Sequence, residues 1–87
     1  MVLETMKLVF DDVKRLANID KHGFDFASLE SDFFVSSRVF PVKNGRFKAV
    51  GILSNKTIVV VFKPLGVEAI SIISMRVASK TERANLL

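Results

Sequence analysis

"VFPVKNGRFKAVGIL", residues 39–53, places Asn44–Gly45 between two β-prone runs. Asn-Gly between such runs is the strongest short-range signal of a β-hairpin, and it predicts a type I′ turn at these two residues. Pro41 lacks an N–H group, so the strand before the turn is expected at the edge of a sheet. The stretch therefore predicts antiparallel pairing in the second half of the chain.

Two more breaks divide the residues that follow this hairpin. "SNK" (54–56) and "PLG" (64–66) separate "TIVVVFK" from "VEAISIISM", so four antiparallel strands in a meander are expected. "IVVVF" (58–62) is apolar at every position, which is typical of a central strand covered on both faces.

The first third of the chain predicts a short strand and two helices. "MKLVF" (6–10) is an apolar run typical of a strand, and Asp11 or Asp12 can cap the helix after it. Gly23 is well placed to end that helix in the left-handed conformation. Asp25 can then cap a second helix, whose apolar residues at helical spacing are Phe26, Leu29 and Phe33.

The first of these helices is expected to be amphipathic. Its apolar stripe, at spacing i, i+3 and i+4, consists of Val13, Leu16 and Ala17. The opposite face carries Lys14, Asn18 and Lys21.

At the other end of the chain, Ser79 and Glu82 have the S-x-x-E spacing of a capping box, so a last helix is expected to start near Ser79. The complete order is a strand, two helices, four strands and a helix. This order predicts a single α+β domain over residues 1–87, with helices packed on a meander sheet.

The composition restricts the class of protein. With 49% hydrophobic and 25% charged residues in a chain of 87, a globular protein is expected. The chain has no cysteine, which excludes disulfides and thiol chemistry, and its one histidine cannot supply a His/Cys zinc site. No apolar run approaches the ~20 residues of a membrane span, and Glu4 makes the N-terminus a poor signal peptide. The expected location is the cytoplasm, without a membrane partner.

Charge is unevenly distributed along the chain. Residues 1–32 carry four basic and seven acidic side chains, a net charge of −3. Residues 33–87 carry nine basic and two acidic side chains, a net charge of +7. A basic C-terminal region suits a polyanion or an acidic protein partner, although a solvated lysine-rich surface accounts for it equally well.

The stretch "FDDVKRLANIDKHGFDF" (10–26) resembles the opening motif of the BrnT-type toxins. In that motif a tryptophan-aspartate pair is followed by Lys, Asn, Lys-His-Gly and Phe at fixed spacing. Phe10 stands where tryptophan is usual. The other positions are filled by Asp11, Lys14, Asn18, Lys21, His22, Gly23 and Phe26.

A second motif, "IISMRVASKTER" (72–83), resembles the family's Ile-Ile-Ser-Ala-Arg segment, which is followed by Ala-Thr and a glutamate. Met75 and Ser79 are near-substitutes. The matching residues are Ile72, Ile73, Ser74, Arg76, Ala78 and Glu82. Between the two motifs, Arg46 and Gly51 match the family's Glu-Arg-Trp…Ile-Gly segment.

This resemblance implies a fold similar to the RelE-like ribonuclease toxins. It implies a small, basic, metal-independent endoribonuclease that inhibits translation and uses no cofactor. It also implies a partner antitoxin of the BrnA type, which carries a ribbon-helix-helix DNA-binding domain and neutralises the toxin. Toxin and antitoxin together repress their own operon, so contact with operator DNA is expected only through the antitoxin.

The chain departs from the family's pattern at three positions. Phe62 replaces a tyrosine, Leu65 stands where an arginine is usual, and Gly45 replaces a glutamate. Lys63 is the only cation close to Leu65 in the sequence. These departures leave a second hypothesis open, in which the protein binds its antitoxin but no longer cuts RNA.

Cutting RNA without a metal needs a group that accepts the 2′-OH proton, cations for the extra charge on phosphorus, and an acid for the leaving 5′-oxygen. Histidine is the side chain best suited to proton transfer near neutrality, and His22 is the only one. Arg76 and Arg46 can each bind a phosphate through two N–H groups. The amides that start the last helix, near Ser79, offer a further anion-binding end.

Each of these candidate catalytic residues has a structural alternative. His22 can bond a backbone carbonyl at the helix end, and Arg46 can be a solvated turn residue. Arg76 can form a salt bridge with Glu82, but an exposed pair contributes only ~0–1 kcal/mol, so a structural need for it is expected to be small. The solvated face is the favoured interpretation of Lys14 and Lys21, with RNA binding as the alternative. The candidate RNA-binding residues are Lys14, Lys21, Lys63, Lys80 and Arg83. The phenylalanines are expected in the core.

Overall fold

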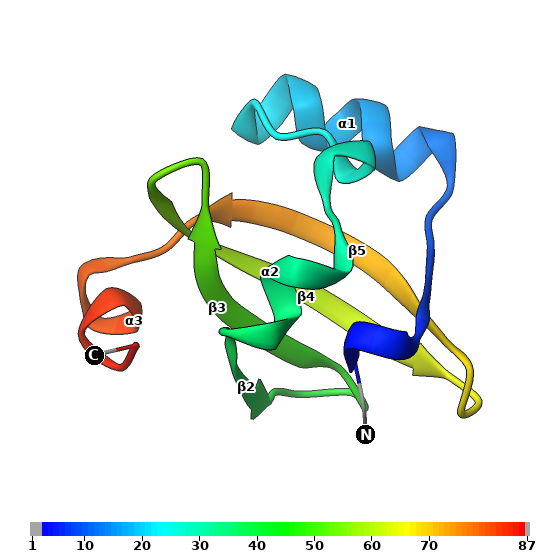
Figure 1. Ribbon diagram of the computed structural model, residues 1–87. Helices are drawn as coiled ribbons and strands as arrows, with labels where there is room; N and C mark the ends of the chain where they lie inside the picture. The colour runs from blue at the N-terminus through cyan, green and yellow to red at the C-terminus, as the bar shows by residue number, and fades with distance from the viewer. Residues whose placement is uncertain (1–2, 87) are drawn as a thin grey trace.

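A five-stranded sheet with its strands in the order β1-β5-β4-β3-β2 forms the centre of the computed structural model, which describes residues 3–86 (Figure 1). The strands are β1 (Lys7–Val9), β2 (Arg38–Pro41), β3 (Phe47–Leu53), β4 (Lys56–Leu65) and β5 (Ala69–Val77). The α-helices are α1 (Asp12–His22), α2 (Ser31–Val35) and α3 (Lys80–Ala84), and two 3₁₀ turns are η1 (Leu3–Thr5) and η2 (Phe26–Ser28).

The hairpin expected around Asn44–Gly45 is confirmed. Both residues have positive φ, 64° and 70°, as a type I′ turn requires, and the Arg46 N–H donates to the Lys43 carbonyl across the turn. Consecutive strands from β2 to β5 pair antiparallel, so the meander is confirmed as well. Pro41 lies on β2, the edge strand, as predicted.

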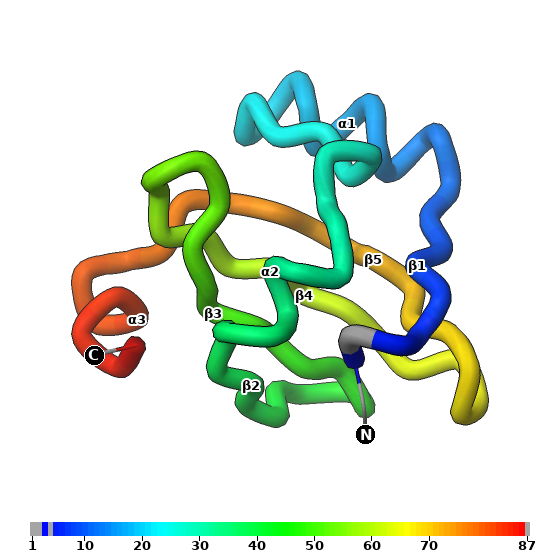
Figure 2. Tube along the Cα trace, viewed as in Figure 1, coloured from blue at the N-terminus to red at the C-terminus, as the bar shows by residue number. Residues whose placement is uncertain are grey.

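The N-terminal strand adds a fifth member to this sheet. β1 pairs in parallel with β5, with Lys7 opposite Ala69 and Val9 opposite Ser71 (Figure 2). It covers only the first three residues of β5. The rest of that edge of β5 is therefore left without a neighbouring strand.

The break expected at residues 64–66 is wrong by two residues, because β4 continues through Pro64 to Leu65 and the turn begins at Gly66. β3 begins at Phe47, opposite Phe62, so Pro64 lies beyond the paired part of that neighbour. A proline is tolerated where a strand has no partner on one side.

The two faces of the sheet are covered very differently. The core face packs against η1, η2 and α2, and its fully buried residues include Ile58, Val60 and Phe62 of the central strand. The opposite face, here called the open face, has a smaller cluster in which Val50 and Val59 pack with Ala78 and Leu86 around α3. β4 is covered on both faces where α3 lies, which confirms the expected central strand.

The single helix predicted after Asp25 is wrong. Asp25 caps only the 3₁₀ turn η2, accepting from the Ala27 N–H, and α2 is a separate five-residue helix. The Ser28 hydroxyl donates to the Asp25 carbonyl at 2.7 Å, a side-chain bond that competes with helix continuation. The three apolar positions that suggested the helix, Phe26, Leu29 and Phe33, are all buried as expected.

The first helix has the expected bounds but the opposite orientation. Asp11 caps α1 and Gly23 ends it at φ 78°, which confirms both ends. However, Val13 and Leu16 are 80% and 58% exposed, whereas Asn18 is buried. α1 lies along the free edge of β5 rather than on a sheet face, and an edge requires hydrogen bonds rather than apolar cover (Figure 1).

Candidate functional site

The Asn18 side chain takes the place of a missing strand beside β5. Its Oδ1 accepts from the Met75 N–H at 3.0 Å, and its Nδ2 donates to the Met75 carbonyl at 3.1 Å. The same Nδ2 donates to the Phe24 carbonyl at 2.9 Å. A side-chain amide is suited to this because it carries both a donor and an acceptor, as a peptide group does. Asn18 thus fixes α1 against β5.

A β-bulge occurs in β5 beside this attachment. Phe62 of β4 pairs with Ile72 and Val61 pairs with Ser74, so Ile73 is the extra residue. Ile72 and Met75 are buried in the core, while Ile73 and Ser74 between them are only partly buried. The bulge therefore directs two neighbouring side chains away from the core toward α1.

A shallow hollow of about 200 Å³ lies where α1 meets the bulge. Its walls on the helix include Lys14, Lys21 and His22, and its walls on the strand are Ile73 and Ser74. Three residues predicted separately, two as RNA-binding and one as catalytic, therefore share one depression. Cationic side chains around a hydroxyl suit a phosphate group.

His22 occupies the last position of α1 and is partly buried. Its imidazole makes no hydrogen bond within residues 3–86, and the helix end is capped instead by the Gly23 N–H, which donates to the Ile19 carbonyl at 2.9 Å. The structural alternative for His22, a bond to a backbone carbonyl, is therefore not what the structure shows.

Arg76 lies two residues beyond Ser74 on β5, about 7 Å along the strand, and its register partner is Val59 of the open face. Its Nη1 and Nη2 donate to the two carboxylate oxygens of Glu82 at 2.7 and 2.9 Å. The Lys48 ammonium donates to the same carboxylate at 3.1 Å. Two cations thus flank one carboxylate on the open face.

The Arg76–Glu82 pair is not the exposed pair assumed from the sequence. Glu82 is 8% exposed, and its carboxylate also accepts from the Ser79 N–H at 2.8 Å, which completes the predicted capping box. The hydrogen bonds from Arg76 are the main reason that the pKa of Glu82 lies far below its ordinary range. Glu82 is the buried partner and Arg76 is partly exposed, so removing Arg76 would leave a buried carboxylate without its main partner, and the structural need for Arg76 is larger than expected.

Lys48 is a functional candidate that sequence reasoning missed. The alternation of side chains along β3 could have identified it, because the residues on either side of Lys48, Phe47 and Ala49, both contribute to the main core. It must therefore point to the open face, where Glu82 holds it.

The remaining predicted residues lie farther away. Phe47 pairs with Phe62, so the register places Arg46 opposite Lys63, four residues along β4 from the partner of Arg76, or roughly 13 Å. Arg46 and Arg76 are thus not brought together. Lys80 and Arg83 are exposed on α3. The Ser79 N–H is already bonded to Glu82, so the expected anion-binding end is partly occupied.

The departures from the family's pattern fall in different environments. Phe62 is fully buried on the core face, with its ring stacked on Phe47 at 5.8 Å between centroids. A tyrosine at position 62, as is usual in the family, would therefore have its ring on the core face and not on the open face. Leu65, at the end of β4, is 46% exposed.

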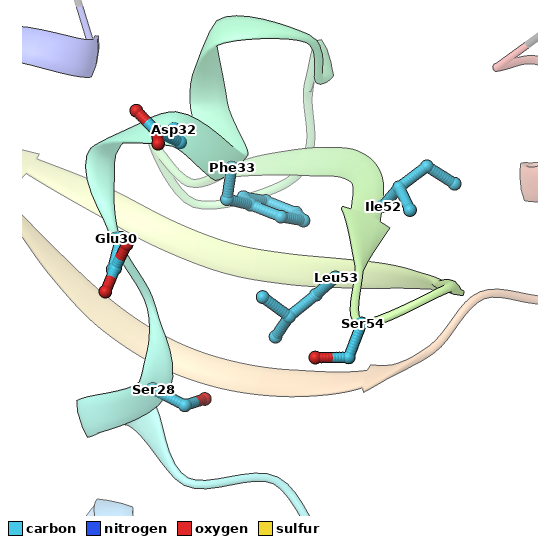
Figure 3. A pocket seen from close by; sticks show the side chains of 7 residues that line it. All are labelled: Ser28, Glu30, Asp32, Phe33, Ile52, Leu53 and Ser54. Carbon is cyan, nitrogen blue, oxygen red and sulfur yellow. The ribbon is translucent and has the colours of Figure 1, made fainter.

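A larger hollow, of about 350 Å³, lies between the η2–α2 segment and the end of β3 (Figure 3). Glu30 and Asp32 stand on its helical side, and Phe33 and Leu53 point into it. Neither carboxylate forms an ion pair within residues 3–86. Carboxylates repel phosphate, so this hollow is not a candidate RNA site.

Among the side chains that the structure describes, those of residues 3 and 5–86, no three His, Asp or Glu groups gather as a metal site would require. In the same part of the chain, no helix has both the length and the apolar character needed to span a bilayer.

Comparison with known proteins places this chain in a family. Residues 10–82 match the family model described as "Ribonuclease toxin, BrnT, of type II toxin-antitoxin system". The chain belongs to this family of ribonuclease toxins, which confirms the resemblance noted in its two motifs.

The chain is also similar to a particular solved protein, the ribonuclease toxin BrnT of Brucella abortus, known from a crystal structure at 1.1 Å resolution. The two share 52% sequence identity and superimpose with a TM-score of 0.81, over 87% of this chain and 100% of that one. This similarity confirms the predicted α+β fold class. No curated protein sequence matches the chain.

Proposed function

We propose that this protein is a metal-independent, cofactor-free endoribonuclease of the cytoplasm that inhibits translation by cutting RNA. Residues 1–87 act as one toxin domain, and a BrnA-like ribbon-helix-helix antitoxin neutralises it and alone contacts operator DNA. Membership of a ribonuclease toxin family supports the reaction class. The observation that carries the proposal is that the His22 hollow ends at Ser74, which precedes Arg76 by two residues, or about 7 Å, along β5.

In this mechanism RNA lies along the open face with one phosphate between His22 and Arg76. His22 takes the proton from the 2′-OH, the 2′-oxygen attacks phosphorus, and the bond to the 5′-oxygen breaks. The leaving oxygen takes a proton from solvent, so the products are a 2′,3′-cyclic phosphate and a 5′-hydroxyl. Lys14 and Lys21, which line the same hollow as His22, hold the neighbouring phosphate.

Arg76 and Lys48 stabilise the charge that develops on phosphorus. Glu82 binds two N–H groups of Arg76, and the Val77 carbonyl accepts from Nη1 at 3.4 Å, which leaves the Nε–H and one Nη2 proton for the substrate. Because Glu82 fixes both cations before substrate arrives, little reorganisation is needed during the reaction. The distant Arg46 and Lys63 bind RNA backbone farther along the open face, together with Lys80 and Arg83 on α3.

The test is cleavage of single-stranded RNA by purified protein in EDTA, measured alongside thermal melting. His22→Ala is expected to lower the rate by about 10²–10⁴-fold without lowering the melting temperature, since the imidazole has no structural bond. Lys43→Ala, in the exposed hairpin turn, serves as the control. A His22→Ala protein that cuts at the wild-type rate refutes the assigned role.

The partner is tested separately, by co-expression with the product of a small adjacent gene that encodes a ribbon-helix-helix protein. A single peak in size-exclusion chromatography at micromolar concentration is expected, together with loss of cleavage. Separate elution would contradict the antitoxin assignment.

A second candidate function is a toxin-like protein that binds its antitoxin without cutting RNA. The observation that favours it is Leu65, which leaves the end of β4 without the family's arginine. Phe62 does not add to it, because that ring is buried in the core. Wild-type protein that forms the complex but cuts no RNA, with EDTA or with added magnesium, would establish this alternative.

A further inference from the structure

A hollow of about 270 Å³ lies on the open face between the β2–β3 hairpin and α3. Its apolar part includes Phe40 and Val50, beside Pro41 and Val42. Its polar groups come from Lys48, Glu82 and Asn85. It is separate from the His22 hollow, but it shares Lys48 and Glu82 with the cation cluster around Arg76.

Phe40 is an exception among the phenylalanines of this chain. Of the eight, seven pack in or against the main core. Phe40 instead belongs to the smaller cluster on the open face and is only partly buried. An aromatic ring placed beside a hollow, rather than in the core, offers a flat surface on which another ring can stack.

Positive charge lies directly beside this ring. Lys48 is the register partner of Phe40 on the neighbouring strand, and its ammonium lies 5.9 Å from the ring centroid. Through Glu82 the same ammonium is linked to Arg76. A nucleotide whose base stacks on Phe40 would therefore have cations within reach of its phosphate. Proteins that bind single-stranded nucleic acids combine aromatic stacking and positive charge in this way.

Asn85 gives the hollow a group that can read a base. Its backbone is fixed, because its carbonyl accepts from Arg38 at 3.0 Å and its N–H donates to Thr81 at 3.2 Å. Its side-chain amide forms no hydrogen bond within residues 3–86, so a donor and an acceptor are available. The two Glu82 oxygens are already engaged by four donors.

We propose that this hollow is a nucleobase subsite, in which the base next to the cleaved phosphate stacks on Phe40 and bonds to the Asn85 amide. The inference rests on the proposed ribonuclease function and deepens it, because it assigns the residues that set base preference. The ligand is an unpaired RNA base, since only an unstacked base can present both its face and its edge.

The first test uses Phe40→Trp. The chain has no tryptophan and no tyrosine, so this residue would dominate the fluorescence. Uridine and adenosine monophosphates and a short RNA oligonucleotide are expected to quench it, and ribose 5-phosphate is not. Val39→Trp, on the same strand and paired with Ala49 of the core face, is the control and should not respond. Equal quenching in both variants, or none in Phe40→Trp, would overturn the subsite.

The second test measures cleavage. Phe40→Ala is expected to raise KM by roughly tenfold with kcat little changed, Phe40→Trp to restore it, and Asn85→Ala to alter the preference among bases. Thermal melting of each variant checks that it is folded. If wild type cuts RNA and Phe40→Ala has the same KM and base preference, the subsite is refuted and the ribonuclease function stands.

The opposite result is equally distinct. Quenching of Phe40→Trp by nucleotides, in a protein that cuts nothing, would support the subsite and refute the catalytic proposal. Quenching by the antitoxin but not by nucleotides would identify the hollow as a protein-binding site and overturn the inference.

Discussion

Replacing Asn18 by alanine should remove the attachment of α1 to β5. Three hydrogen bonds disappear, and the Met75 N–H and carbonyl, both in buried bonds to Asn18, lose their partners. An unsatisfied buried polar group costs about 1–3 kcal/mol, and the partly buried Phe24 carbonyl adds roughly 0.5–1.5 kcal/mol. Water entering through the hollow beside Asn18 offsets part of this. The expected loss of unfolding free energy is about 3 kcal/mol.

For a domain of this size, a loss of about 3 kcal/mol corresponds to a fall in melting temperature of roughly 12–24 °C. Circular dichroism during thermal and urea unfolding at pH 7 measures it. Leu16→Ala on the exposed side of α1 is the matched control, with an expected change within about 0.5 kcal/mol. A loss below about 1 kcal/mol for Asn18→Ala would refute the view that this side chain acts as a surrogate peptide group.

Asn18→Asp tests the same view with almost no change in shape. The carboxylate keeps the acceptor for the Met75 N–H but loses the donors to two carbonyl groups and adds a charge facing them. A loss at least as large as that of Asn18→Ala is expected at pH 7. Protonation restores one donor, so the difference from wild type should shrink as pH falls. A difference that is independent of pH would contradict this account.

Two further stability measurements follow from charges and backbone geometry. Because the pKa of Glu82 is depressed, its contribution to the free energy of unfolding is complete above the ordinary pKa of 4.5 and is lost as pH falls below that value. Wild type should therefore be more stable than Glu82→Gln by about 2 kcal/mol at pH 7, and this difference should shrink in acid. Glu30→Gln, at an exposed residue, is the control and should have the same dependence of unfolding free energy on pH as wild type. If Glu82→Gln also has the wild-type pH dependence, the stabilising role of the Arg76–Glu82 pair is contradicted. Gly23→Ala should lower the free energy of unfolding by about 1 kcal/mol, because residue 23 has a φ of 78°. Thermal melting measures this, with Lys43→Ala as the control. An unchanged melting temperature for Gly23→Ala would exclude the left-handed cap.

Local signals in the sequence predicted the parts of the fold that depend on neighbouring residues. The Asn44–Gly45 turn, the Asp11 and Gly23 ends of α1, and the capping box at Ser79 are each defined within about four residues, and each is confirmed. The central strand was also predictable, since an apolar run has few other stable positions in a sheet.

The orientation of α1 was not predictable from its pattern. Its apolar stripe of Val13 and Leu16 follows helical spacing, yet these residues face solvent. The face that packs is decided by the unpaired edge of β5, and that edge exists only because β1 stops after three paired residues. Hydrophobic periodicity shows where apolar residues recur along a helix, but not where a strand edge needs a hydrogen-bond donor and acceptor.

The candidate site was predicted as residue types but not as an arrangement. The sequence pointed to Lys14, Lys21 and His22, which share a hollow, and to Arg76. Lys48 was missed because its role depends on the pairing of β3 with the rest of the open face. Arg46 was grouped with Arg76 on residue type, and the strand register separates them.

The bulge at Ile73 has a consequence for how the length of this chain can vary. Deleting one residue from a paired strand normally turns every later side chain to the wrong face. Ile73 has no register partner, so its removal would leave Ile72 and Met75 in the core and Ser74 and Arg76 on the open face. β5 can therefore lose one residue here without refolding the sheet, and relatives that differ in length inside β5 are expected to differ at this position.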